Sequence, residues 1–144
     1  LTLTNIEDKP GVAAKIFGPL ASSGVNIDMI VQSNTETGLT NITFSCPEDE
    51  LDIAKKAISK AKEKNVVSYE RLIENKNLAK VSIIGIGMKT HAGVAQKMFE
   101  TLSQENININ VISTSEIKLS VLIERKYLEL AVRSLHDAFG LQNL

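Results

Sequence analysis

Two polar loops carry the residues best suited to bind a small charged ligand. One covers residues 7–11 and the other residues 87–93, and each ends on a glycine where a helix is expected to begin. The first backbone N–H groups of a helix have no acceptor within the helix and, helped by the helix dipole, can hold a carboxylate. The carboxylate of Asp8 could accept a hydrogen bond from an ammonium group. Together these groups suit a zwitterion such as a free amino acid.

Neutral amide side chains accompany the loops. Asn26, Gln32, Asn108 and Asn110 can each donate and accept hydrogen bonds around the facing strands. Each piece also has an ordinary interpretation, because Pro-Gly is a common turn into a helix, and Asn26 and Asn108 could be left-handed residues before strands. The ligand interpretation is favoured because both loops carry the same elements at the same spacing.

That spacing comes from an internal repeat. The sequence GVAAKIF at 11–17 returns as GVAQKMF at 93–99, with five of seven residues identical. The same offset of 82 residues carries Asn26 onto Asn108 and Ser33 onto Ser115. Units of this length indicate two duplicated domains rather than a solenoid. We predict a first domain at 1–77 and a second at 78–144, and because domains this small are marginal alone, we expect them to associate.

The apolar pattern predicts the elements that position the loops. In the first copy we expect strands at 1–6, 26–33, 40–46 and 66–73, with helices after Gly11 and Glu50; in the second, strands at 81–86, 111–115 and 118–124, with helices at 93–105 and 128–135. This order predicts an α+β fold of two ferredoxin-like βαββαβ modules, each an antiparallel sheet with helices on one face, the second lacking its last strand. Since the chain also begins without Met, we interpret it as a piece of a longer protein.

Composition argues against several classes of partner. The 16 basic and 17 acidic residues give a net charge of −1, which does not suit a nucleic-acid or anionic-membrane binder. The apolar runs are short and no secretory leader is visible, so a cytoplasmic location is expected. Cys46 is the lone cysteine and His91 and His136 are distant in sequence, which predicts no metal site. The loop at 85–90 lacks the glycine that a phosphate loop has before its lysine.

The loop motifs and the strands after them resemble a known family. The sequence DKPGVA at 8–13 is followed by NIDMIVQ at 26–32, and GMKTHAGV at 87–94 by ISTSEIK at 112–118. These stretches resemble the tandem ACT domains of aspartate kinase, and the resemblance spans essentially the whole chain. The Ser-Thr-Ser-Glu-Ile phrase is specific to that family, whereas the Pro-Gly loop is common to many ACT domains.

The resemblance implies a regulatory segment without a catalytic site. Aspartate kinase phosphorylates the side-chain carboxylate of aspartate with ATP, at the head of lysine, threonine and methionine synthesis. Its kinase domain, which uses ATP and Mg, carries a Lys-Phe-Gly-Gly type motif that this chain lacks, so no catalytic residue, metal or cofactor is assigned to this segment. The implied function is feedback inhibition by lysine, threonine or both. The implied partners are a second copy of the chain, through its ACT modules, and the kinase catalytic domain or alpha subunit.

The resemblance also implies an effector site at an interface between modules of two chains. Residues of the first loop and Gln32 would face residues of the second module across it. The implied set is Asp8, Gly11, Val12, Ala13, Asn26, Ile27, Asp28, Gln32, Met88, Thr90, His91, Asn108, Ile109, Asn110, Ser115 and Glu116. Two departures leave the ligand preference of the second site open, since Ala92 stands where the family usually has Pro and Asn110 where an acid is more usual.

Two other functions remain open at this stage. One is an amino-acid-sensing subunit of another biosynthetic enzyme, which would share the first loop. The other is a structural dimerisation module, in which the loops are only turns and no small molecule changes stability. Whether lysine and threonine act singly or together, which pocket binds which, and whether the segment belongs to a fused kinase or a separate subunit are also left open.

Overall fold

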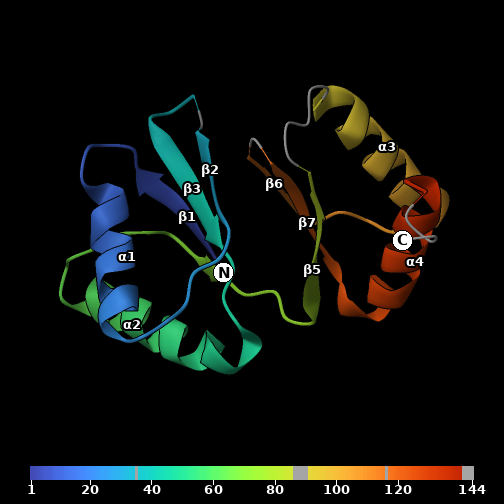
Figure 1. Ribbon diagram of the computed structural model, residues 1–144. Coiled ribbons are helices and arrows are strands. Elements are labelled where there is room, and N and C mark those ends of the chain that lie inside the picture. Colours follow the sequence, from blue (N-terminus) through green and yellow to red (C-terminus); the bar gives the residue numbers. More distant parts are fainter. Residues whose placement is uncertain (35, 86–90, 116, 141–144) are drawn as a thin grey trace. The chain divides into compact units, whose positions relative to one another are not determined.

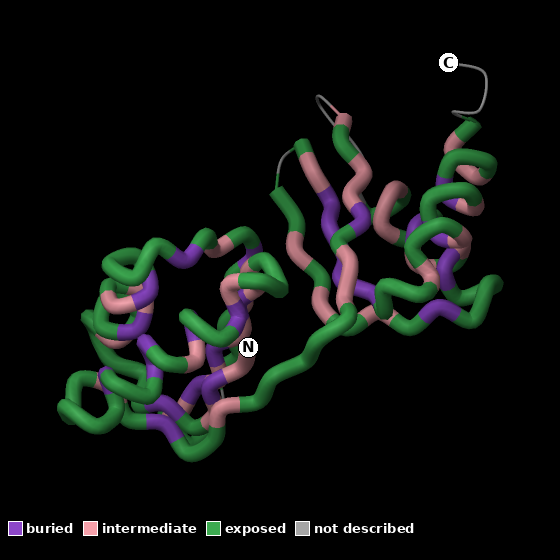
Figure 2. The backbone as a smooth tube through the Cα atoms, turned by 90° about the horizontal axis from the view of Figure 1, so that it is seen from below, coloured by how far each residue is buried: buried purple, intermediate pink, exposed green. Residues whose placement is uncertain are grey.

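The structure, a computed structural model, describes residues 1–34, 36–85, 91–115 and 117–140. The chain divides into two compact units, unit 1 at Leu1–Lys76 and unit 2 at Asn77–Leu144 (Figure 1). Each unit has its own buried core, and Figure 2 shows the buried residues on strands and helices of both. None of the described helices is long and apolar enough to cross a membrane.

Unit 1 has the predicted order of strand, helix, strand, strand, helix and strand. Its elements are β1 (Thr2–Glu7), α1 (Val12–Ser22), β2 (Ile30–Asn34), β3 (Leu39–Phe44), α2 (Leu51–Glu63) and β4 (Leu72–Ile73), with a 3-10 turn at Glu48–Glu50. The strands form one antiparallel sheet in the order β2-β3-β1-β4, and α1 and α2 cover one face of it (Figure 1). The ferredoxin-like fold is therefore confirmed for this unit.

The core of unit 1 follows from the spacing of its apolar residues. Ile16 and Leu20, one turn apart in α1, are both buried, as are Ile42 and Phe44, two residues apart in β3. These spacings place each pair on one face of its helix or strand. The ring of Phe17 meets Phe44 edge to face, with 5.7 Å between centroids. Burial of these side chains joins the helices to the sheet.

The fourth strand of unit 1 is much shorter than predicted. After α2, the N–H groups of Val66 and Val67 donate to Ala61 O at 2.9 and 3.4 Å, which closes the helix rather than starting a strand. Tyr69 is buried against the core, and its carbonyl oxygen accepts a hydrogen bond of 2.9 Å from Lys62 Nζ. Only Leu72 and Ile73 are left to form β4 beside β1.

The described residues of unit 2 repeat this order as far as its second helix. Its elements are β5 (Leu78–Ile84), α3 (His91–Gln104), β6 (Val111–Thr114), β7 (Lys118–Glu124) and α4 (Leu128–Ala138), with a 3-10 turn at Arg125–Tyr127. Its described residues form a three-stranded antiparallel sheet in the order β5-β7-β6. Val121 and Ile123 of β7 lie in one buried cluster with Met98 and Leu102 of α3.

Candidate functional site

The loop after β1 presents a helix N-terminus that no side chain caps. Gly11, at the N-cap of α1, has φ 89°. The N–H of Val12 donates to Lys9 O at 3.3 Å, but the N–H groups of Ala13 and Ala14 have no acceptor in the part of the chain that is described. Both alanines are exposed. The loop therefore offers two free donors, reinforced by the helix dipole, to an anionic group.

Of the two acids in this loop, Glu7 forms an ion pair and Asp8 forms none with the described residues. Lys9 Nζ lies 2.9 Å from a carboxylate oxygen of Glu7, and this hydrogen bond lowers the pKa of Glu7 and raises the pKa of Lys9. Asp8 is exposed and has no ion-pair partner among the described residues, while its N–H donates to Gly38 O at 3.1 Å. The loop is thus tied to the turn between β2 and β3 while the Asp8 carboxylate stays available.

Gln32 belongs to a polar network that reaches toward the same end of the sheet. It is exposed on the edge strand β2, and its Nε2 donates to Asn34 Oδ1 at 3.3 Å. The hydroxyl of Thr40, which is fully buried, has more than one acceptor within hydrogen-bond distance for its one hydrogen, among them Ser33 O at 3.0 Å and Asn34 Oδ1 at 3.2 Å. Because Thr40 pairs with Ile6, this network approaches the place where β1 runs into the loop.

The segment from Asn26 to Asp28 lies beyond the other end of α1. The N–H and the Nδ2 of Asn26 both donate to Glu50 Oε1, each at 3.1 Å, so its amide donors are already in use. Ile27 packs against the core, and the N–H of Asp28 donates to Ser45 O at 3.1 Å. The ordinary interpretation of Asn26 and Asn108 as left-handed residues is wrong, because the positive φ values belong to Asn5, Asn65, Asn77 and Asn106.

The corresponding segment of unit 2 is more open. Asn108 is exposed, and its side chain makes no hydrogen bond within the described residues. It borders a surface hollow of about 400 Å³ lined by Phe99, Ser103, Asn106, Ile107, Asn108 and Ile109. The N–H of Asn110 donates to Leu122 O at 2.8 Å, and the N–H of Ser115 to Lys118 O at 2.7 Å, so these two residues mark the ends of the β6 pairing. Asn108 can therefore offer both its donor and its acceptor to a ligand.

The structure places the remaining predicted site residues as follows. The side chains of Val12 and Ile109 pack against the cores of their units, so each can offer a ligand mainly its backbone. Met88, Thr90 and Glu116 lie outside the described residues, and so does the side chain of His91, the first residue of α3. Two features were missed from the sequence: the contact of Glu50 with Asn26, and a bulge at Asn5 in β1.

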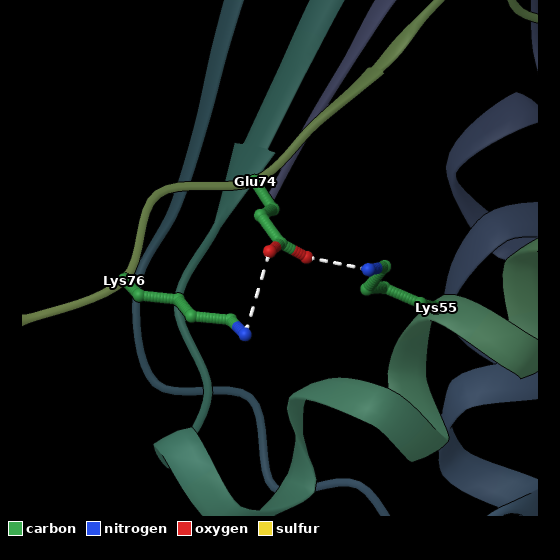
Figure 3. A network of polar contacts seen from close by, with 3 residues as sticks. All are labelled: Lys55, Glu74 and Lys76. Carbon is green, nitrogen blue, oxygen red and sulfur yellow. Dashed lines mark ion pairs between the residues drawn. The ribbon is translucent and has the colours of Figure 1, made fainter.

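Ionic groups outside the loops serve the fold rather than a ligand. Glu74 follows β4 directly. Its Oε2 lies 2.6 Å from Nζ of Lys55 in α2, and its Oε1 lies 3.6 Å from Nζ of Lys76 (Figure 3). The hydrogen bond from Lys55 lowers the pKa of the Glu74 carboxyl. These contacts tie the chain that leaves unit 1 to α2. Among the described residues there is also no group of three or more His, Cys, Asp or Glu placed to hold a metal ion.

Comparison with known proteins gives consistent matches. A family model described as ACT domain matches residues 4–61 and 81–139. The aspartokinase of Pseudomonas aeruginosa is 51% identical over 145 residues, covering 98% of this chain but 34% of the relative. A crystal structure of aspartokinase alpha and beta subunits has a TM-score of 0.83 at 41% identity, and the regulatory subunit of aspartate kinase from Thermus thermophilus has 0.82 at 35%. Each match covers 96% of this chain and 90% of the other. The chain thus spans about a third of the curated relatives' length and most of a solved regulatory subunit.

Proposed function

Because this chain belongs to the ACT domain family and corresponds to the regulatory part of aspartate kinases, we propose that it binds a free amino acid and makes the attached kinase respond to it. The observation that carries the proposal is the loop at residues 8–14. It combines the N–H groups of Ala13 and Ala14 with the carboxylate of Asp8, none of which has a partner among the described residues. Such a loop can meet both charges of a zwitterion, the carboxylate through the helix N-terminus and the ammonium through Asp8.

The proposed effector site is shared between modules of two copies of the chain. The loop precedes α1 and the Asn26 segment follows it, so the 11 residues of the helix separate them by about 16 Å at 1.5 Å per residue. A single amino acid is too small to touch both. A complete site therefore combines the loop of one module with the segment after the first helix of another. The exposed edge strands β2 and β6, with Ile30 and Ile112 on their surfaces, offer the contacts for this pairing.

The two modules contribute differently to such a site. Glu50 occupies the amide donors of Asn26, whereas the amide of Asn108 has no partner within the described part of the chain. We assign the polar contact with the effector to Asn108 and its backbone neighbours Ile109 and Asn110, opposite Asp8, Gly11 and Gln32. The effector is lysine, threonine or both, the products of the pathway that aspartate kinase opens. The same proposal includes five further residues of the second module: Met88, Thr90, His91, Ser115 and Glu116.

The proposed mechanism is a shift in population between two states of the kinase. The effector binds the paired state of the modules more tightly, and this differential affinity favours an inactive arrangement of the catalytic domain or alpha subunit. Coupling of this kind is worth about 1 to 3 kcal/mol, and a hydrogen bond about 1 kcal/mol. The loss of one or two hydrogen bonds at Gln32 or Asn108 is therefore enough to abolish inhibition. In this proposal the enzyme works in the cytoplasm, and ATP and Mg bind only to its kinase part.

The experiment that tests the proposal is inhibition of the intact kinase that contains this segment. Gln32→Ala removes an exposed amide from one face of β2, and Ser33→Ala is the matched control because it alters the next residue, on the other face. Inhibition by L-threonine and L-lysine is measured for both variants. The proposal expects Gln32→Ala to lose inhibition and Ser33→Ala to keep it. Full inhibition of Gln32→Ala would show that the site is elsewhere.

A further inference from the structure

Strand β1 contains a bulge three residues before Asp8. Its pairing with β3 runs Thr2 to Thr43 and Leu3 to Ile42, then resumes as Ile6 to Thr40 and Glu7 to Leu39. Two residues of β1, Thr4 and Asn5, therefore stand opposite the single residue Asn41. A bulge of this kind shifts every following residue of the strand by one position.

The bulge decides which side chains of β1 reach the core. Leu3 and Ile6 are both buried, at 0% and 2% exposure. In a regular strand, residues three apart point to opposite faces, so one of the two would leave the core. The extra residue brings Ile6 back to the face of Leu3. It also places Glu7 opposite Leu39, from where the N–H of Asp8 reaches Gly38 O.

Asn5 is the residue that forms the bulge. Its φ of 52° is left-handed, a conformation that asparagine tolerates better than most side chains other than glycine. Its N–H donates to Asn41 Oδ1 at 3.0 Å, so a side chain replaces the missing partner in the strand ladder. Its own Nδ2 donates to the carboxylate of Glu70.

The segment just before β4 holds the bulge from the other side. The N–H of Thr4 donates to Arg71 O at 3.0 Å, and the N–H of Glu70 donates to Thr4 O at 2.9 Å. The N–H of Arg71 also donates to the Thr4 hydroxyl at 3.0 Å. Partners on both sides thus fix the bulge, which makes it a defined feature of unit 1.

The described strands of unit 2 contain no equivalent bulge. Strand β5 pairs with β7 continuously over seven residues, from Leu78 opposite Glu124 to Ile84 opposite Lys118, without a shift. The same family model matches both units, yet of the described first strands only the one that leads into the Asp8 loop is bulged. This restricts the role of the bulge to that loop.

We propose that Asn5 is a positioning residue of the effector site, which sets the register of the Asp8–Gly11 loop through its left-handed backbone and its hydrogen bond to Asn41. The inference rests on the proposed amino-acid binding for its functional consequence. Its structural part, the register of the loop, can be tested without any ligand. Neither Asn5 nor Asn41 touches the effector in this proposal.

The test compares variants at Asn5 and Asn41 in the 144-residue chain. Asn5→Ala opposes the left-handed backbone, whereas Asn5→Gly permits it. Asn41→Ala removes the acceptor of the Asn5 N–H, and Asn41→Asp keeps one. The matched control is Asn65→Ala. Asn65 also has a left-handed φ, 58°, so alanine is opposed there in the same way, but it lies in the turn after α2, outside β1 and its neighbours.

Two quantities are measured for each variant: hydrogen exchange at the Asp8 amide without ligand, and affinity for L-threonine and L-lysine by calorimetry. We expect Asn5→Ala and Asn41→Ala to exchange Asp8 faster and to bind at least about tenfold more weakly, a loss of about 1.4 kcal/mol. Asn5→Gly and Asn41→Asp should resemble the unchanged chain. Asn65→Ala should lower the melting temperature but leave both quantities unchanged.

The outcomes separate this inference from the proposed function. If Asn5→Ala exchanges Asp8 no faster than Asn65→Ala, the positioning role is overturned whether or not an amino acid binds. If Asp8 exchanges faster but affinity is unchanged, the loop register does not serve binding, and the inference is also overturned. If the unchanged chain binds neither amino acid, the proposed function fails, while the exchange data still decide whether Asn5 sets the register.

Discussion

At the scale of single residues, the site depends on backbone conformation and on side-chain contacts that hold it. Gly11 and Asn5 adopt left-handed conformations on either side of Asp8. The carboxylate of Glu50 accepts two hydrogen bonds from Asn26, one from its N–H and one from its Nδ2. These groups do not carry the charges that meet an amino acid in the proposed site. They fix where those charges and the free N–H groups lie.

Gly11 provides a test of this backbone role. Gly11 and Gly24 have φ of 89° and 77°, and a Cβ at either would meet nothing within 4 Å, so alanine is opposed there by backbone conformation alone. We expect Gly11→Ala and Gly24→Ala each to lower the free energy of unfolding by about 1 to 2 kcal/mol in urea denaturation. Only Gly11→Ala should also weaken amino-acid binding, because Gly24 precedes Asn26, whose amide donors Glu50 already occupies. Equal binding by the two variants would contradict a role for the loop.

The contact between Glu50 and Asn26 gives a second prediction at this scale. Glu50→Ala removes the acceptor of two hydrogen bonds that are partly exposed, so we expect a loss of about 1 kcal/mol in the free energy of unfolding. The Asn26 amide should exchange faster in this variant. Asp49→Ala is the control, since it alters the adjacent acid and leaves Glu50 in place. If both variants lose the same stability, the Glu50 contact with Asn26 is not what stabilises this region.

At the scale of elements, the order and most boundaries were predictable from the sequence, and the irregular parts were not. The apolar spacing in α1 and α2 predicted helices because one face of each is buried in the core. The length of β4 was wrong, since Val66 and Val67 close the preceding helix through Ala61 O. The bulge was missed because it depends on Asn41, a residue far along the chain, although Asn5 between Leu3 and Ile6 already broke the alternation.

The ion pair between Glu74 and Lys55 of α2 predicts an effect of pH on stability. The folded pKa of Glu74 lies below 4.5 because of Lys55, so the ion pair stabilises the fold above about pH 4.5 and this contribution is lost as pH falls through the folded pKa. We expect Lys55→Met to raise the Glu74 pKa toward its usual value in an NMR titration of the carboxyl carbons. Lys9→Met, which removes the partner of Glu7, should leave Glu74 unchanged. An unaltered Glu74 pKa in Lys55→Met would mean that the pair does not form in solution.

At the scale of the whole molecule, the candidate site was only partly predictable. The repeat predicted a loop and an asparagine segment in each module, but α3 begins at His91, so Gly93 lies inside its helix whereas Gly11 lies at the start of α1. The predicted helix after Gly11 already separated loop from segment, and the structure adds its length, 11 residues from Val12 to Ser22. This geometry is the reason for proposing a site shared between two modules rather than one within each.

The two separate cores make a prediction about stability. Ile42 is buried in unit 1 and Ile123 in unit 2, and replacing either by alanine should cost about 2 to 5 kcal/mol in its own unit. We expect Ile42→Ala to reduce hydrogen-exchange protection in α1 and β3, and Ile123→Ala to do so in α3 and β7. A uniform loss of protection over the whole chain in either variant would show that the units unfold as one.

The most direct test of the central claim is a calorimetric titration of the 144-residue chain with L-threonine and with L-lysine, each alone and in the presence of the other. The account predicts saturable heat with at least one of them, weakened by Gln32→Ala and preserved in Ser33→Ala. Stronger binding of one amino acid in the presence of the other would identify a concerted sensor. If the chain is dimeric and neither amino acid gives saturable heat, the chain is not a sensor of these amino acids and the account is contradicted.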